Sequence, residues 1–458
     1  MKPMTCTSVI NIPWLTAIPE HWKIVRAKGL FSARTERARP DDEQLSATQA
    51  YGVIPQKEFE RRVGRKVVQI MQHLDKRAHV EPDDFVISMR SFQGGLERAW
   101  ARGCIRSSYV VLKPSPETQV GYFAHLFKSL DYIRALQATG NFIRDGQDLN
   151  FNNFSLVDLP LPPLDEQADI AKCLDYANRK IDGFIRAKRK LIGLLNEQKQ
   201  AIIHHAVTRG LDPDVPLKPS GIPWLGDIPK HWDVLRAKYL FCEVDKRSKE
   251  GKETHLAMSQ RLGLVPSNMV ESAMRSESYA GAKLCQEGDL VLNRLKAHLG
   301  VFALAKQDGV ISPDYSVFRK RATISMEYYE SALRSSACRR ELRIRAKGLV
   351  EGFWRLYTDD FYDIRLPVPP LDEQREIMSA ITVETAALNT AIARTEREIA
   401  LMQEYRMRLT ADIVTGKLDV REAAAKLPDL PTDPAAELFT GEALEHTDIL
   451  DEIEPEEF

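Results

Sequence analysis

The sequence lacks the cysteine pairs and the long apolar runs that would mark several common protein classes. Its six cysteines are scattered singly along 458 residues, and none forms a C-x-x-C pair. We therefore expect neither a zinc site nor a disulfide framework. No window approaches the ~20 consecutive apolar residues of a membrane span, and the N-terminal segment has no apolar run before a cleavage site. These absences favour a cytoplasmic protein with no membrane contact.

The sequence also lacks an excess of either charge, but its charges are unevenly distributed. The formal net charge is −1, yet residues 428–458 contain eleven Asp and Glu and no Lys or Arg. The rest of the chain carries about ten more basic than acidic residues, mainly in 1–160 and 209–366. This excess favours a polyanionic partner, although ordinary solvated surface explains it about equally well.

The chain is an internal duplication. Residues 12–31, IPWLTAIPEHWKIVRAKGLF, match residues 222–241, IPWLGDIPKHWDVLRAKYLF, at thirteen of twenty positions. LPLPPLDEQADI (159–170) matches LPVPPLDEQREI (366–377), and VTRGLD (207–212) matches VTGKLD (414–419). Three matches in the same order at nearly one offset indicate a tandem repeat of about 207 residues.

Each repeat begins with a mixed region of about 150 residues. Runs rich in β-branched residues and bounded by turn formers predict strands, and stretches such as 118–137 and 326–345 predict helices. The strand runs are DFVISM (84–89), SYVVLK (108–113), DLVLN (289–293) and YSVFRK (315–320). The fold class of both regions is therefore predicted to be α+β.

Each repeat ends with a segment of more than forty residues that contains no proline. Apolar residues recur every three or four positions, which predicts an amphipathic helix of coiled-coil type. A Pro-Pro pair and an acidic pair precede or open each segment and a glycine closes it, as in helix starts and stops. The acidic pairs and glycines are Asp165-Glu166 with Gly210, and Asp372-Glu373 with Gly416.

The matched placement of the two helices favours antiparallel pairing over two unrelated surface helices. The pair would then form a rigid spacer with a pseudo-twofold axis and an α+β domain at each end. We predict α+β domains at 1–160 and 211–367, spacer helices at 161–210 and 368–417, and an acidic, disordered tail at 418–458. The tail would serve solubility, or would transiently screen a basic face.

These motifs resemble those of a known family. The IPWL…IP-x-HW segment resembles the start of a target-recognition domain in the specificity subunits of type I restriction–modification systems. LP-x-PPLDEQ resembles the start of that family's conserved helices, and VTGKLDVR (414–421) resembles the close of the distal one. The resemblance covers about residues 11–425, and the motifs occur in the same order twice.

The resemblance implies a non-catalytic subunit that binds double-stranded DNA. Each recognition domain would read one half of a bipartite target, and the helices would set the gap and dock two modification (methyltransferase) subunits. Restriction subunits would complete the ATP-dependent nuclease. The resemblance implies no cofactor in this chain, because AdoMet, ATP and Mg²⁺ would be used by the partners.

The motifs that the sequence lacks agree with this expectation. The sequence has no [N/D]-P-P-[F/Y] tetrapeptide, no glycine-rich AdoMet loop after a strand and no phosphate loop. Pro82-Asp83 and Pro313-Asp314 lack a following acid-x-Lys of the nuclease type, and the adjacent His204-His205 point about 100° apart on a helix. His21 and His231 recur beside Trp22 and Trp232 without a repeated catalytic partner. We interpret these two histidines, together with Trp14, Trp22, Trp224 and Trp232, as structural anchors of the two domains.

Residues that contact DNA are predicted from basic and polar side chains in loops after buried-looking strands, and from two basic clusters. The loop candidates are Arg90, Ser91 and Gln93 in the first copy and Asn293, Arg294, Lys296 and His298 in the second. The cluster candidates are Lys57, Arg61, Arg62, Arg65 and Lys66, and Arg343, Arg345 and Lys347 near Trp354. For each residue a plain surface role is about as well supported. Two other functions stay open, a self-contained nuclease or methyltransferase and a coiled-coil scaffold that binds no nucleic acid.

Overall fold

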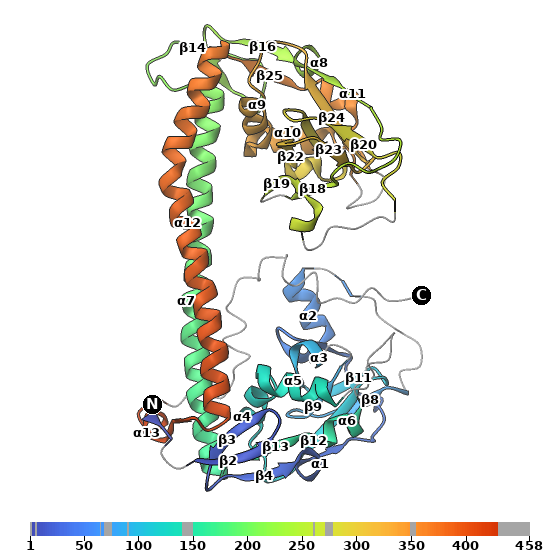
Figure 1. Cartoon of the computed structure of the whole chain (residues 1–458), viewed down its shortest axis with the longest axis vertical. Coiled ribbons are helices and arrows are strands. Elements are labelled where there is room, and N and C mark those ends of the chain that lie inside the picture. Colours follow the sequence, from blue (N-terminus) through green and yellow to red (C-terminus); the bar gives the residue numbers. More distant parts are fainter. Residues whose placement is uncertain are drawn as a thin grey trace. The chain divides into compact units, whose positions relative to one another are not determined.

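The computed structural model describes residues 2–4, 7–64, 66–67, 76–88, 91–139, 150–259, 262–270, 278–348 and 354–428. The chain divides into two compact units (Figure 1). The first contains Met1–Ala187 and Glu398–Phe458, and the second contains Lys188–Arg397. Each unit therefore combines one α+β domain with parts of both long helices.

The domain of the first unit is built on a four-stranded antiparallel sheet in the order β10-β9-β12-β5. Its strands are β1 (Lys2–Pro3), β2 (Thr7–Ile12), β3 (Leu15–Pro19), β4 (Lys23–Arg26), β5 (Phe31–Ala33), β6 (Leu45–Thr48), β7 (Gly52–Pro55), β8 (Ala78–Val80), β9 (Phe85–Ile87), β10 (Glu97–Arg98), β11 (Gly103–Ile105), β12 (Val110–Pro114) and β13 (Asp158–Leu161). Its helices are α1 (Ala27–Leu30), α2 (Gln56–Val63), α3 (Ser91–Gly94), α4 (Val120–Leu126), α5 (Leu130–Ala138) and α6 (Phe151–Ser155). Aromatic rings around the buried Phe31 join the sheet to these helices.

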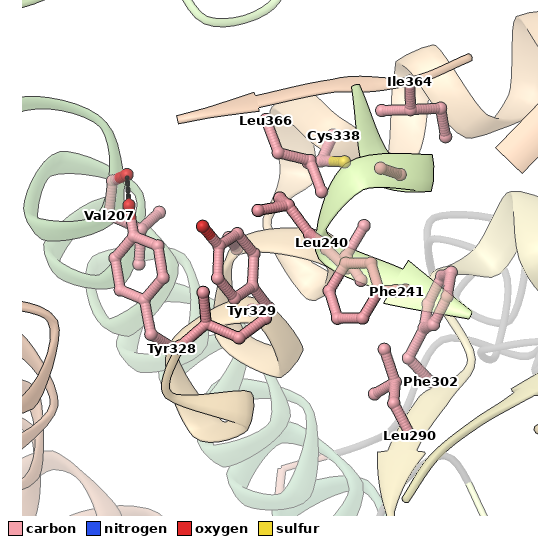
Figure 2. Close-up of a cluster of buried hydrophobic side chains, with 14 of the residues drawn as sticks. Val207, Leu240, Phe241, Leu290, Phe302, Tyr328, Tyr329, Cys338, Ile364 and Leu366 are labelled. Carbon is pink, nitrogen blue, oxygen red and sulfur yellow. Dashed lines mark hydrogen bonds between the residues drawn. The ribbon is translucent and has the colours of Figure 1, made fainter. Parts of the chain in front are cut away.

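The domain of the second unit repeats this architecture with the sheet order β22-β21-β24-β17. Its strands are β14 (Leu217–Pro219), β15 (Asp227–Pro229), β16 (Asp233–Arg236), β17 (Phe241–Glu243), β18 (Leu256–Ser259), β19 (Gly263–Pro266), β20 (Lys283–Cys285), β21 (Leu290–Asn293), β22 (Phe302–Leu304), β23 (Gly309–Ile311), β24 (Tyr315–Lys320) and β25 (Arg365–Val368). Its helices are α8 (Ala237–Leu240), η2 (Ser267–Met269), η3 (Arg294–Leu299), α9 (Met326–Arg334), α10 (Ser336–Arg345) and α11 (Thr358–Tyr362). Figure 2 shows part of the core, where Phe241, Tyr329 and Phe302 pack among aliphatic side chains.

The four predicted strand runs became the inner strands of the two sheets. β9 and β12 pair in the first domain, and β21 and β24 pair in the second. Both predicted helical stretches contain a pair of helices, α4 with α5 and α9 with α10. The α+β prediction is confirmed, with the same sheet order in both copies.

The two long helices are α7 (Leu164–Arg209) and α12 (Leu371–Val414). In the first unit Arg406 of α12 forms an ion pair with Asp182 of α7. In the second unit Lys199 Nζ donates to Asn389 Oδ1 over 2.7 Å. The higher-numbered end of one helix thus meets the lower-numbered end of the other, at the same register in both units. The predicted antiparallel pairing is confirmed.

The repeated His-Trp motif joins each domain to both long helices. His21 Nε2 lies 2.7 Å from Glu166 Oε2 in the first turn of α7, and His231 Nε2 lies 2.8 Å from Glu373 Oε2 in that of α12. A Cβ atom added at Gly416, just after α12, would lie 2.9 Å from the Trp22 ring. A Cβ atom added at Gly210, just after α7, would lie 3.3 Å from the Trp232 ring. Each motif therefore contacts the start of its own repeat's helix and the end of the other's, and the structural-anchor interpretation holds.

We call these contacts between a domain and the two helix ends the joint, and other repeated residues contribute to it. Gln167 of the LDEQ motif accepts the Gln119 amide over 2.8 Å and donates to the Pro162 carbonyl over 2.9 Å. Gln374 binds the Ser325 amide and the Pro369 carbonyl in the same way.

Two buried tyrosines reach the far ends of the helices. The Tyr122 hydroxyl donates to the Val414 carbonyl over 3.0 Å, and the Tyr328 hydroxyl to the Val207 carbonyl over 2.8 Å (Figure 2). These bonds satisfy carbonyls that the last turn of a helix leaves without intrahelical partners.

The expected tail boundary is corrected. Residues 418–428 are folded: β26 (Leu418–Asp419) pairs with β1, and α13 (Arg421–Ala424) follows it. Val420 and Ala424 are buried in the first unit, so this segment belongs to the domain rather than to a tail. Residues 429–458 lie outside the described part. None of the described helices meets the length and hydropathy of a membrane span.

The joint predicts unequal costs for two glycine substitutions. Gly416 has φ +74°, and a Cβ there would lie 2.4 Å from Pro19 and 2.9 Å from Trp22. Gly221 has φ +70° with no atom near such a Cβ. Gly221→Ala should cost about 1 kcal/mol from backbone strain alone, and Gly416→Ala at least ~2 kcal/mol because the joint must also open. Urea-denaturation midpoints of the full chain measure both, and equal costs would show that the joint is not tightly packed.

Candidate nucleic-acid interface

The structure brings together the two predicted basic segments of the second copy. η3, which follows β21 directly, packs against α10. Asn293 is buried, and its Oδ1 accepts the amides of Leu295 and Lys296 over 3.1 and 3.3 Å. Asn293 therefore caps η3, and its side chain points into the structure. Lys296 is exposed, and the side chain of His298 lies outside the described part.

Arg294 attaches η3 to the rest of the second domain. Its Nε donates to the Asp314 carbonyl over 2.8 Å, and its side chain is largely buried. Asp314 also receives Arg355 over 3.1 Å. The Arg294 guanidinium thus joins η3 to the turn before β24, where it adds positive charge but is already hydrogen-bonded.

The three candidates near the end of α10 differ in their surroundings. Arg345 is paired with Glu341 over 2.7 Å along the helix. The Arg343 guanidinium lies over the Trp354 ring, 5.2 Å from its centroid, and is exposed to solvent. Lys347 is paired with Asp360 over 2.7 Å but is 68% exposed. Arg343 and Lys347 are therefore the members of this cluster that a phosphate or a base edge can reach.

The first copy has its basic cluster elsewhere in the domain. Arg61 and Arg62 of α2 both bind Glu58, and the Arg62 guanidinium also lies over the Tyr51 ring. Lys57 is 81% exposed, 3.8 Å from Glu43. Lys66 is exposed, and Arg65 lies outside the described part. α2 packs on β6 and β7, and the matching position in the second copy holds the shorter η2.

The loop candidates of the first copy are divided between surface and interior. Ser91 is fully buried, and its hydroxyl accepts the Ser88 amide over 2.9 Å at the start of α3. Gln93 is exposed, and Arg90 lies outside the described part. α3 packs against α5 as η3 packs against α10.

This packing reveals residues that the sequence reasoning missed. α5 and α10 occupy matched positions, because Ser129 and Ser335, 206 residues apart, precede them and donate to Leu126 and Ala332 over 2.7 Å. Arg134 and Arg340 are exposed at the same place on the two helices. An alignment of the two repeats would have indicated both arginines, because they fall at the same exposed position in the helical pattern of apolar residues.

A further group of cations lies where α7 passes α9 and α10 in the second unit. Partial burial, together with the charges of Arg340, Arg209 and His205, lowers the pKa of His204 below its usual value. Burial and the charge of Arg334 lower the pKa of Lys199 as well. This positive potential would favour a nearby polyanion.

The His204 shift predicts a pH dependence of stability. Because its folded-state pKa is below the unfolded value of about 6.5, the unfolded chain binds more protons near pH 6. The contribution of His204 is therefore present above the unfolded pKa and is lost as the pH falls through the folded pKa. His204→Gln should reduce the loss of thermal stability between pH 7.5 and 5.5, and His205→Gln, which removes only the smallest of the causes that lower the pKa of His204, should reduce it less. An unchanged pH profile in His204→Gln would contradict the shift.

The described residues hold no group of three or more His, Cys, Asp or Glu side chains placed to bind a metal. What the surface offers is exposed Arg and Lys beside polar and apolar side chains, which suits contacts to phosphates and base edges.

Comparison with known proteins agrees with this chemistry. A family model described as type I restriction modification DNA specificity domain matches residues 19–191. The EcoKI specificity subunit of Escherichia coli K12 is 25% identical over 398 residues, 78% of this chain and 82% of the relative. The MjaVIII specificity subunit of Methanocaldococcus jannaschii is 23% identical over 428 residues, 88% and 94% of the two chains. A solved chain from a study of the type I R-M system has a TM-score of 0.56 at 16% identity, covering 88% of this chain and 99% of its own, so the fold is shared. The resemblance drawn from the sequence motifs is confirmed.

Proposed function

We propose that this chain, as a type I restriction–modification specificity subunit, selects the DNA sequence at which catalytic partner subunits act. Each recognition domain reads one half of a bipartite, interrupted target in double-stranded DNA. The paired helices set the gap between the two halves. The chain itself would operate in the cytoplasm, where the chromosomal DNA lies.

The observation that carries the proposal is the reciprocal joint. In both units the His-Trp motif, the helix-start Glu and Gln, and a buried tyrosine bind the domain to the helix pair through equivalent contacts. The exposed basic surfaces of the two domains differ, with α2 in one and α10 in the other. Identical attachments with different surfaces suit one scaffold that reads two different half-sites, as symmetric DNA-binding dimers read spaced half-sites.

The helices also have features that suit docking of two modification subunits. Large apolar side chains are exposed on α12: Val383, in the second unit, is 72% exposed, and Leu401 and Tyr405, in the first, are 56% and 51% exposed. Such residues on a helical surface are typical of protein contacts. In the proposal AdoMet, ATP and Mg²⁺ are used by the modification and restriction subunits.

Mapping modified adenines in the source cell tests the proposal directly. It should reveal a bipartite motif with a fixed gap, and deletion of this chain should abolish that motif. Incubation of the purified chain alone with DNA, AdoMet and Mg²⁺ should give neither methylation nor cleavage. Activity without partners would favour a self-contained enzyme, and equal affinity for all DNA sequences would favour a non-reading scaffold.

Lengthening both helices should lengthen the gap. Insertion of one heptad between Asp182 and Lys199 and another between Asn389 and Arg406 keeps the antiparallel register and adds about 10 Å, or about 3 bp of DNA. The motif of modified adenines should keep both half-sites and gain the longer gap. Insertion into α7 alone is the control and should disrupt pairing. Changed half-sites at an unchanged gap would refute the spacer role.

Exposed lysines on the candidate DNA-contact surfaces of the two domains should contribute to affinity rather than to specificity. Lys66→Ala and Lys296→Ala should each weaken binding about equally for target and random duplexes, because phosphate contacts carry no sequence information. The slope of log affinity against log salt should fall by about 1 for each lysine removed. Binding of the full chain with its modification subunits over a salt series measures this. An unchanged slope would remove that lysine from the interface.

A further inference from the structure

One outward-facing surface of α10 combines basic side chains with a single exposed isoleucine. α10 buries Ala337, Cys338 and Leu342 against the domain core. The opposite face follows the i, i+4, i+7, i+8 spacing of a helix. We call it the α10 face: Ser336, Arg340, Arg343 and Ile344, continued by Lys347. Ile344 is 79% exposed, the largest fraction among the large hydrophobic residues of the described chain.

The charge of this face is positive, because Arg340, Arg343 and Lys347 lie on it and, within the part of the chain that the structure describes, only Lys347 is paired with an acid, Asp360. The acidic residue within 336–347, Glu341, is paired with Arg345 on another side of the helix. Arg340 has no ion pair among the described residues. The ring of Trp354 orients the Arg343 guanidinium. An isoleucine surrounded by these cations is poorly suited to a neutral protein groove.

The major groove of DNA offers partners for both the cations and the isoleucine of this face. An α-helix fits into it, phosphates line its rim, guanine presents acceptors to arginine, and thymine presents an apolar methyl group. Contact with that methyl would remove Ile344 from water, while Arg340, Arg343 and Lys347 lie near acceptors and phosphates. Charge and apolar content therefore fit one occupant, a DNA duplex.

The matched helix of the first domain supports a reading role. At the positions 206 residues earlier, α5 presents Leu130, Arg134, Gln137 and Ala138 on the same face. The supports below the two helices are equivalent, since each helix follows a buried serine whose hydroxyl donates to the carbonyl three residues earlier, and each packs on the short helix after the inner strand. Only the arginine is retained on the outward faces. This is the pattern expected where two equivalent elements read different bases.

We propose that the α10 face enters the major groove and reads the half-site of the second domain, with Ile344 contacting a thymine methyl group. α5 has the corresponding role in the first domain, with Ala138 at the position of Ile344. The inference rests on the proposed function, because it assigns the reading element within each recognition domain.

The test compares binding by the full chain with its modification subunits to a randomised duplex pool. Ile344→Ala should lower the preference for one T·A pair about tenfold in one half-site, the usual scale for a single base-pair contact. The other half-site and the gap should stay the same. Uracil in place of that thymine, which removes only the methyl group, should weaken wild-type binding by a similar factor and leave Ile344→Ala binding unchanged.

Two further variants keep the test decisive. Ala138→Ile should alter preference in the other half-site, and Tyr239→Ala, which removes an exposed side chain from α8, should alter neither. Three results with Ile344→Ala would overturn the inference. These are unchanged preferences, changes in both half-sites, and loss of all binding at an unchanged melting temperature. Loss of all binding counts against it because one base contact accounts for only about tenfold. A wild-type complex that binds every duplex equally would instead refute the proposed function.

Discussion

The structure depends on one repeated joint, in which a buried tryptophan and its neighbouring histidine fasten a domain to two helix ends. Trp22 packs against the glycine that follows α12 while His21 binds the first turn of α7, and the second copy exchanges the two helices. Because each domain contacts the start of one helix and the end of the other, it holds the helices side by side. Antiparallel pairing thus follows from the domains as well as from the helix seam. Loss of a buried tryptophan would cost roughly 3–5 kcal/mol.

This joint contains the motifs that the two copies share, and it lies apart from the surfaces proposed to contact DNA. The motifs shared by both copies lie in the joint: His-Trp before β4 and β16, LDEQ in the first turns, and the glycines after the helices. The helices proposed to contact DNA, α2, α5 and α10, carry different residues from the matching helices of the other copy. The surfaces proposed to contact DNA can therefore differ between the copies without disturbing the attachment, since the hydrogen bonds and ion pairs described for the joint involve no side chain of the α10 face.

The sequence predicted the attachment far better than the interface. The duplication, the inner strands and both long helices could be read from repeats, β-branched runs and apolar spacing. The candidates for DNA contact were chosen from residue type and loop position. In the structure some of them are buried and others are exposed. Ser91 and Asn293 point inward because their polar atoms bind nearby backbone amides, whereas Lys57, Lys66, Gln93 and Lys296 are exposed. Residues 418–428 were expected in a tail because the acidic composition nearby suggested disorder, but Leu418 pairs with Pro3 and Val420 lies in the core of the first domain.

By itself the sequence determined that there are two equivalent domains and two matched helices, because local periodicity and repeated motifs are encoded in neighbouring residues. Only the tertiary structure decided which helix end each domain contacts, since Trp22 meets Gly416 and Tyr122 meets Val414 across several hundred residues of sequence. It also decided which face of α10 is left in water. Ile344 carries no local signal of its exposure, which follows from the side of the helix that the core of the second domain already covers.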